Sequence, residues 1–522
     1  MRPARRRVIA ALVAAATVAA STACAPITDP GWMPPPWPVV ADVRVVEPPA
    51  PVDLAHAPVV AASVTPVRLR DDSARVQART LFLPGVGAFN AAVEDQLREG
   101  LHGAAQASGT RYTPTVFPRG AGLGDRLCVA GSTGLPAADV LTDPALGPAG
   151  GAGTALVCDV VAAADTFLGL RVRIVSGSAE EVASDIAVIT YGDAATGEAV
   201  SAAGLWAEGA ADTLSADIVD AVRRDAGALS LAPPSAGDDA QLEAIRAALT
   251  TTVPTAAGLA FTIAPGFSAP ELTALGVVAT TVPLTVEVPA AVAAELVSPF
   301  GARMLEAGAR AYAVPARVGA GWTDCSLTPC VAVTYDDGPS RFTPGILDEL
   351  NARGAVATFF ALGQYAAGGR DTLRRMTAEG HEVENHTWNH PNLTDLTAEQ
   401  VASQIDSTTV ALEAASGQAV RVFRPPYGEF DASTLAAAGM AAILWDVDTS
   451  DYQHPSADVL VARAVDPPRP GSIVLVHDIH ESTAVATPRI IDGLLDRGFT
   501  LVTVSQLFDG SLPTSGAWRR AP

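Results

Sequence analysis

The chain has 522 residues, of which 49 % are hydrophobic, and its 34 basic and 56 acidic side chains give a net charge of −22. This length predicts two or three domains, and the apolar content is ample for ordinary cores. The acidic excess argues against nucleic acid or an anionic membrane surface as a partner, because both require a basic patch. It suits a protein that handles neutral or cationic polymers.

The first 24 residues have the three parts of a secretory signal. Met1–Arg7 carries four arginines, Val8–Ala20 is apolar except for one threonine, and small residues lead to Cys24. The apolar run is shorter than the roughly 20 residues of a membrane-spanning helix. Ser21–Cys24 resembles a bacterial lipobox, in which the cysteine is lipidated, although Ser21 replaces the usual leucine. The alternative is a plain secretory signal in which Cys24 has no role, and both interpretations predict export.

Five cysteines are an odd number for an exported protein. If Cys24 carries the lipid, four remain, and two disulfides would account for them. Cys325 and Cys330 flank a proline-containing turn and are expected to pair, which leaves Cys128 to pair with Cys158. No cysteine pair lies beside a histidine with zinc-finger spacing, so we interpret these four as structural.

The chain before residue 320 is predicted to contain a tether and an accessory domain. Residues 25–62 are rich in Pro, Ala and Val, as is typical of an extended, semi-rigid linker. Residues 63–312 are predicted to form an α+β domain. Its expected strands are 156–161, 170–174 and 186–191, and its expected helices are 89–101 and 241–249.

Beyond residue 320 short apolar strands alternate with helical segments, which predicts a parallel sheet and an α/β fold. The expected strands are 331–335, 356–361, 382–384, 420–423, 442–445, 473–476 and 501–504. The expected helices between them are 344–353, 373–379, 398–415, 432–438, 457–464 and 488–496. Seven such units predict a small or incomplete (β/α) barrel over residues 320–522, with its chemistry at the C-terminal ends of the strands.

Polar clusters follow these strands, where a barrel of this kind places its chemistry. They are 336–338, 386–390, 424–428, 446–451 and 477–478. Six of the eight histidines of the chain lie between residues 381 and 480, which chance does not readily explain. These clusters therefore predict one functional site.

His386 and His390 are four residues apart, so on a helical turn both imidazoles would face one side and share a metal ion. A carboxylate would complete a three-ligand hydrolytic site with open positions. Alone, the pair is more typical of a solvated helix face, but Asp336, Asp337 and His477 at matching strand ends favour a metal. Adjacent aspartates that leave a strand point in opposite directions, so one would bind the metal and the other face the substrate. A pair of turn-forming aspartates is the alternative.

Five ordered motifs resemble those of the polysaccharide deacetylases of carbohydrate esterase family 4. They are Thr334–Pro339, His386–His390, Arg424–Gly428, Asp448–Tyr452 and Leu475–His477. The similarity spans about residues 325–510 and implies a distorted (β/α)7-type barrel. It also implies metal-dependent hydrolysis of acetyl groups from an extracellular glycan.

The resemblance implies which residues hold the metal and activate water. Asp337, His386 and His390 would bind a divalent metal, most commonly zinc, with cobalt or another divalent ion as alternatives. Asp336 would be the general base that takes a proton from the water that this metal binds. Arg424 would pair with Asp336 and hold its charge and position.

The remaining motif residues would act on the acetyl group. By the same resemblance, the backbone N–H of Tyr427 would stabilise the oxyanion, and His477 would be the general acid. Asp451 would orient His477 and keep it protonated. Structural ion pairs are the alternative for Asp451 and Arg424.

The pocket for the acetyl group would be lined by Pro426, Tyr452 and Leu475. Tyr452 stands where the family usually has tryptophan, and Tyr335 replaces the commoner phenylalanine. The first difference affects the expected substrate range more than the chemistry. His381 and His454 are expected to be peripheral, whereas His480 is a candidate for a place near the cleft.

The middle region shows a looser similarity. Phe89–Val93 and Phe261–Pro289 resemble parts of an accessory domain found beside some cell-wall deacetylases and in an extracytoplasmic anti-sigma factor. The region is therefore expected to position the C-terminal domain or to bind glycan.

Export favours peptidoglycan N-acetylglucosamine or N-acetylmuramic acid as the substrate, although the motifs do not identify the polymer. Chitooligosaccharides and acetylated xylan are the alternatives within the same chemistry. A non-catalytic wall-binding or sensing lipoprotein with a degenerate deacetylase fold is the alternative from another class.

Overall fold

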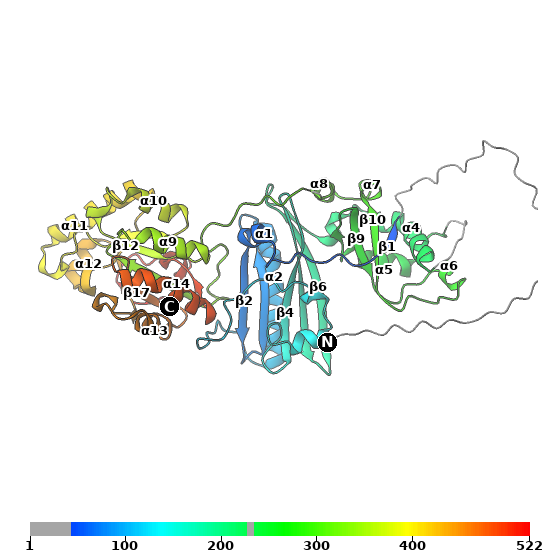
Figure 1. Cartoon of the computed structure of the whole chain (residues 1–522), viewed down its shortest axis with the longest axis horizontal. Coiled ribbons are helices and arrows are strands. Elements are labelled where there is room, and N and C mark those ends of the chain that lie inside the picture. The colour runs from blue at the N-terminus through cyan, green and yellow to red at the C-terminus, as the bar shows by residue number, and fades with distance from the viewer. Residues whose placement is uncertain (1–42, 227–233, 309) are drawn as a thin grey trace, which may run out of the picture. The chain divides into compact units, whose positions relative to one another are not determined.

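Three β-sheets organise the residues that the computed structural model describes, which are 43–226, 234–308 and 310–522 (Figure 1). Among these residues, no helix has the length and apolar content needed to cross a membrane. Asp42–Pro522 forms one compact unit, so the division into an accessory and a catalytic domain stays a prediction. The predicted leader, residues 1–24, lies outside the described residues.

A six-stranded sheet and one long helix form the first layer pair. In spatial order the strands are β2 (Thr65–Asp71), β3 (Val76–Phe82), β4 (Ala152–Ala164), β5 (Phe167–Ser178), β6 (Val182–Asp193) and β7 (Ala199–Ser201). Only β3 and β4 run parallel. Helix α2 (Gly87–Ser108) lies along one face (Figure 1), with Phe89 and Leu97 buried in a common core with Leu156. A Cβ at Gly100 would lie 2.7 Å from the Leu156 side chain, so glycine permits this close approach.

A four-stranded antiparallel sheet forms the second part of the middle region. Its order is β1 (Arg44–Val46), β10 (Leu284–Pro289), β9 (Gly258–Ile263) and β8 (Val253–Pro254). Helices α4 (Ala210–Asp225) and α5 (Asp239–Leu249) bury Ile218 and Ile245 against Phe261 of this sheet. Shorter helices are α3 (Ala137–Thr142), α6 (Pro270–Thr273), α7 (Ala290–Ala293) and α8 (Pro299–Ala307).

The tether predicted for residues 25–62 was wrong in its C-terminal part. Arg44–Val46 pairs with β10, and Pro58–Ser63 forms helix α1. Val43 and Val60 are buried, so apolar side chains among the prolines decide the structure here. Residues 25–42 lie outside the described residues.

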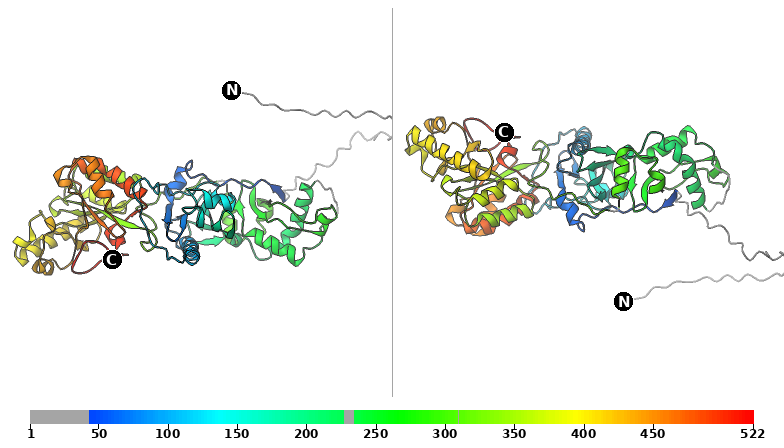
Figure 2. Two further views of the ribbon diagram at one scale, coloured as in Figure 1. Left: turned by 90° about the horizontal axis from the view of Figure 1, so that it is seen from below. Right: turned by 90° about the horizontal axis from the view of Figure 1, so that it is seen from above.

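The C-terminal region contains a parallel sheet of nine strands, which confirms the predicted α/β fold with a distorted (β/α) barrel. The path is β16 (Val447–Asp448), β17 (Ile473–His477), β11 (Cys330–Asp336), β12 (Thr358–Ala361), β13 (Glu382–Asn385), β14 (Val422–Phe423), β15 (Ala441–Ile443) and β19 (Ala517–Trp518). Strand β18 (Thr500–Leu501) pairs with the start of β11. The sheet curls, and its helices lie outside it in both views of Figure 2.

Seven helices cover this sheet. They are α9 (Thr343–Ala352), α10 (Arg370–Ala378), α11 (Ala398–Ser416), α12 (Ala432–Ala438), α13 (Ala457–Val465), α14 (Glu481–Asp496) and α15 (Val504–Leu507) among the described residues. Local sequence sets the limits of α11, because Thr397 and Gln400 form a capping box and Gly417 ends the helix at φ 76°. Helix α14 begins at Glu481, not at the predicted Pro488. Buried Thr483 and Ala486 extend its apolar face and outweigh the cost of the internal proline.

Two disulfides join the four cysteines of the folded regions. Cys128 pairs with Cys158, and Cys325 pairs with Cys330, the first residue of β11. Both predicted pairings are therefore present. Cys24 is the only cysteine of the sequence outside these bridges, and it lies outside the described residues.

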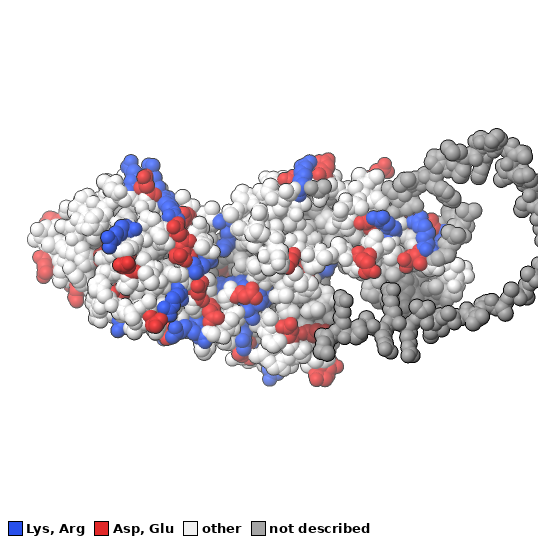
Figure 3. Space-filling model, viewed as in Figure 1, with Lys and Arg blue, Asp and Glu red and all other residues white. Residues whose placement is uncertain are grey.

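The surface carries charges of both signs. On the face drawn in Figure 3, basic and acidic side chains alternate rather than forming a broad basic patch.

Candidate active site

The five polar clusters converge on one cavity of about 460 Å³ at the C-terminal ends of the parallel strands. Its lining residues are Asp336, Asp337, His386, His390, Pro425, Tyr427, Trp445, Asp448, Tyr452, Leu475, His477 and His480. The strand ends meet here because β11, β12, β13 and β17 run in parallel register. The location predicted from the alternation of strands and helices is therefore where these side chains gather.

Asp337, His386 and His390 form a group able to hold a divalent metal ion. Their potential ligand atoms all lie within 4.8 Å of one another. The Nε2 atoms of both histidines are 3.5 Å from Asp337 Oδ1, a buried oxygen that has no hydrogen-bond partner. A buried carboxylate oxygen without a donor is costly, and a cation at this point would compensate it. The donor set therefore fits a metal.

The orientation of His386 supports the same assignment. Its Nδ1 lies 2.8 Å from the carbonyl oxygen of Arg424, which leaves Nε2 free toward Asp337. Burial lowers the pKa of His386 to about 3, so the imidazole is neutral, as a metal ligand must be.

The two histidines do not lie on a helical turn, so that part of the prediction was wrong. They occupy an irregular segment after β13, in which Thr387 and His390 have φ values of 70° and 65°. Asn385 Oδ1 accepts a hydrogen bond from the Thr387 N–H, and Thr387 Oγ1 accepts one from the His390 N–H. These side-chain contacts replace helical hydrogen bonds and still bring both imidazoles to one side.

Asp336 and Asp337 also differ from the expected arrangement. They do not diverge, because the φ of 75° at Asp337 returns its side chain to the cavity that Asp336 also lines. Asp336 is 2 % exposed, and its Oδ1 accepts a hydrogen bond of 2.7 Å from Arg424 Nη1. Burial raises the pKa of Asp336, although Arg424 and His477 oppose this effect. The carboxylate is thus a stronger base than a solvated aspartate.

Arg424 is completely buried in the barrel and donates four hydrogen bonds. Nη1 also contacts Thr334 Oγ1, while Nε and Nη2 donate to the carbonyl oxygens of Ile443 and Leu444. The guanidinium lies over the Phe360 ring at 4.0 Å. Its ion pair with Asp336 matches the pairing that the resemblance implied.

His477 and Asp451 form the second hydrogen-bonded pair of the cavity. His477 Nδ1 lies 2.7 Å from Asp451 Oδ1, and Asp451 Oδ2 accepts from Thr483 Oγ1 at 2.6 Å. Burial alone would lower the pKa of His477, but the bond to Asp451 and the nearby Asp336 charge raise it to about 9. The imidazole is therefore protonated at neutral pH.

Three predicted pocket residues can be compared with the cavity. Tyr452 and Leu475 line it, whereas Pro425 does so in place of the predicted Pro426. Tyr427 has a φ of 61°, and its backbone N–H donates no hydrogen bond within the described part of the chain. That N–H is available for an external acceptor.

Some residues of the cavity region were missed or underrated by sequence reasoning. Trp445 ends an expected strand and was taken only as part of it, and His480 lines the cavity with its ring against that of His454. Asp478 is fully buried beneath Gly338, where a Cβ would lie 2.1 Å from Asp478 Oδ2. Burial raises the pKa of Asp478 to about 7. The only sequence feature that could have pointed to Asp478 is its position directly after His477.

Comparisons with known proteins agree on the C-terminal region. The family model described as polysaccharide deacetylase matches residues 324–443. A chitooligosaccharide deacetylase of Sinorhizobium fredii is 39 % identical over 196 residues, which cover 34 % of this chain and 91 % of that protein.

Two peptidoglycan deacetylases match over a smaller share of their length. The peptidoglycan-N-acetylmuramic acid deacetylase PdaC of Bacillus subtilis is 40 % identical over 34 % of this chain and 38 % of its own. The peptidoglycan-N-acetylglucosamine deacetylase PgdA of Listeria monocytogenes is 36 % identical over 35 % of this chain and 39 % of its own. The chain thus matches about two fifths of these relatives. The family-model match, together with the match to 91 % of the Sinorhizobium protein, shows that the chain belongs to the polysaccharide deacetylase family.

Proposed function

We propose that the protein hydrolyses N-acetyl groups of an extracellular glycan with a divalent metal, zinc in the first instance, held by Asp337, His386 and His390. One observation carries the proposal. The unpartnered Asp337 Oδ1 lies 3.5 Å from two imidazole Nε2 atoms, in the same cavity as a buried carboxylate and a protonated histidine. When bound, the metal supplies Lewis acidity that polarises the acetyl carbonyl and acidifies water.

The chain's own residues would then move two protons. Asp336, whose pKa burial raises, takes the proton of the attacking water, and Arg424 fixes the carboxylate in place. His477 carries a proton at neutral pH and delivers it to the departing amine, while Asp451 holds its ring by Nδ1. The free N–H of Tyr427 donates to the oxygen that becomes negative in the transition state.

The proposed substrate is N-acetylglucosamine or N-acetylmuramic acid of peptidoglycan. Relatives named for both sugars match the region that contains the site, and so does a relative named for chitooligosaccharides. Chitooligosaccharides are therefore the first alternative. The exposed Tyr452 at the cavity wall gives this pocket a hydroxyl that the family's usual tryptophan lacks.

The activity is tested with the purified full chain, zinc, and either peptidoglycan or chitooligosaccharides. We expect release of acetate, together with a loss of 42 mass units per deacetylated sugar, that a chelator abolishes. His390→Ala is the matched control, because it removes one proposed ligand that is partly exposed. If the zinc-loaded chain released acetate from neither glycan, the deacetylase proposal would fail and the wall-binding alternative would replace it.

We propose further that the protein acts outside the cytoplasmic membrane as a lipoprotein anchored through Cys24. The two disulfides use the other four cysteines and favour an oxidising compartment. Mass spectrometry of the mature protein should find an N-terminal Cys24 carrying lipid, and Cys24→Ser should release the protein from membranes. An unmodified mature N-terminus at another residue would contradict the anchor.

A further inference from the structure

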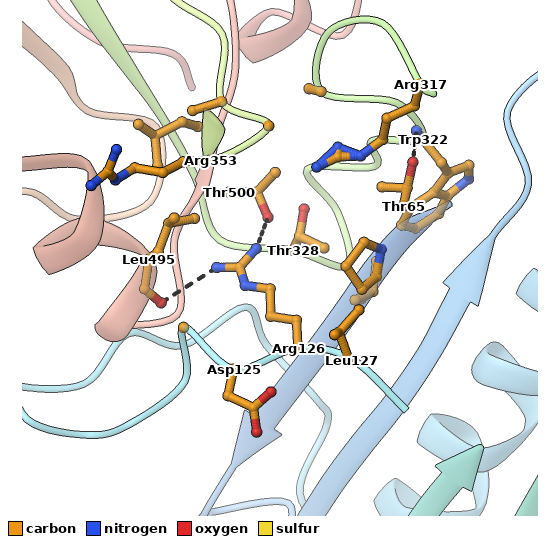
Figure 4. Close-up of a pocket in the computed structure, with 17 residues that line it drawn as sticks. Thr65, Asp125, Arg126, Leu127, Arg317, Trp322, Thr328, Arg353, Leu495 and Thr500 are labelled. Carbon is orange, nitrogen blue, oxygen red and sulfur yellow. Dashed lines mark hydrogen bonds between the residues drawn. The ribbon is translucent and has the colours of Figure 1, made fainter. Parts of the chain in front are cut away.

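A second cavity, of about 240 Å³, contains arginines that face no carboxylate (Figure 4). It is lined by the start of β2, by residues 124–127 and 317–328, and by residues 353–355 and 495–501. Thr500 and Leu501 pair with the first two residues of β11, whereas Asp336 of the candidate active site is its last residue. The cavity therefore lies at the opposite end of the parallel sheet from the candidate active site.

Arg126 is the central cation of this cavity. It donates to Thr500 Oγ1 at 3.3 Å and to the carbonyl oxygens of Leu495, at 3.4 Å, and of Phe499, while its buried Nε has no partner. It forms no ion pair with any described residue. Burial, together with the charges of Arg68 and Arg317, lowers the pKa of Arg126 to about 10.

Arg317 is the second cation. Its Nε donates to the carbonyl oxygen of Val64 at 3.0 Å, but neither Nη atom has a partner in the described part of the chain. The guanidinium packs against Gly354, where a Cβ would lie 1.7 Å from Nη2. Its direction is thus fixed by contacts at both sides, and Figure 4 shows it extending toward the middle of the cavity.

The two other charged residues of the lining do not neutralise this pair. Asp125 contacts Arg79 through Oδ2, and in Figure 4 its carboxylate points away from the Arg126 guanidinium. Arg353 forms ion pairs with Glu349 and Asp492, and its guanidinium points out of the cavity. In a chain of net charge −22, two unpaired and partly buried guanidiniums beside the hydroxyl of Thr500 are an unusual concentration of donors.

We propose that Arg126 and Arg317 form a binding site for an oxyanion, a phosphate or carboxylate group of a small molecule or of a wall polymer. Burial of unpaired cations is unfavourable, and an oxyanion that accepts from both guanidiniums would compensate it. The cavity is slightly smaller than ordinary ligand pockets, which favours one charged group rather than an extended glycan chain. Because the anion would contact Arg126, Arg317 and Thr500 together, its binding should stabilise the folded chain.

The test titrates the zinc-loaded full chain with inorganic phosphate, and separately with acetate, at constant ionic strength. Isothermal titration calorimetry gives the affinity, and the melting temperature gives the stabilisation. We expect saturable binding of at least one anion and a rise in melting temperature. The anion that binds with the higher affinity, inorganic phosphate or acetate, identifies phosphate or carboxylate as the natural group.

The variants distinguish this cavity from other places that bind anions. Arg317→Gln should weaken binding at least about tenfold, since it removes a charged donor. Arg353→Gln is the matched control, because it lines the same cavity but is already paired, and it should bind as the wild type does. Absence of binding in the wild type would overturn the proposal. So would equal affinity in Arg317→Gln, which would indicate an anion on the catalytic metal instead.

Discussion

Replacement of Asp336 by asparagine is expected to reduce deacetylation roughly 10²- to 10⁴-fold while leaving the metal content unchanged. An amide cannot take a proton from water, but Asp336 is not one of the three proposed ligands. Its contact with Arg424 Nη1 can be kept by the amide oxygen, so the barrel should fold. Acetate release and metal analysis of the same preparation provide the measurement.

Asp337→Asn is the matched comparison, because it replaces the neighbouring carboxylate by an amide in the same way. This variant should lose metal as well as activity, since Asp337 Oδ1 faces both histidines. Changes outside the ligand shell already cost 10- to 100-fold in metal affinity, and a direct ligand should cost at least as much. Equal metal content with full activity in both variants would refute the division into base and ligand.

The second large effect concerns the basic limb of the pH profile. His477 must be protonated to act as an acid, and it carries its proton below a pKa of about 9. Hence kcat/KM should be maintained toward pH 9 and fall above it. In Asp451→Asn the hydrogen bond to an anion is lost, and the pKa of His477 should fall toward the ordinary value of about 6.5. The activity lost at pH 8 would then be about 30-fold, from the protonated fraction alone.

The control for this shift is Asp448→Asn. Asp448 lines the same cavity but accepts its hydrogen bond from the Ser450 N–H rather than from His477. We expect its basic limb to stay near that of the wild type. A basic limb that is unchanged in Asp451→Asn would show that Asp451 is structural, as the alternative from the sequence proposed.

Much of the C-terminal fold could be predicted because its signals are local. Apolar runs of strand length recur between amphipathic segments, and the polar clusters follow them directly. The conformation of the histidine segment could not be predicted in the same way. A spacing of four suggests a helix, but the positive φ values at Thr387 and His390 depend on hydrogen bonds that the side chains of Asn385 and Thr387 accept from the backbone N–H groups of Thr387 and His390.

The remaining errors share a cause in tertiary context. Proline content predicted a tether through residue 62, yet Arg44–Val46 adds a strand to β10, more than 230 residues further along the chain. Pro488 was taken as a helix start, although burial of Thr483 and Ala486 extends α14 before it. Arg126 and Arg317 of the second cavity come from distant positions as well, so no motif marks them.

Arg424 has a consequence for how variants of this protein should be interpreted. Its four hydrogen bonds reach Thr334 of β11, the end of β15 with the residue that follows it, and the carboxylate of the proposed base, so one side chain supports both barrel closure and the base. Lysine has a single compact ammonium and cannot satisfy acceptors in four directions. In a genetic screen for lost activity, substitutions at this position would therefore report misassembly and failed chemistry together.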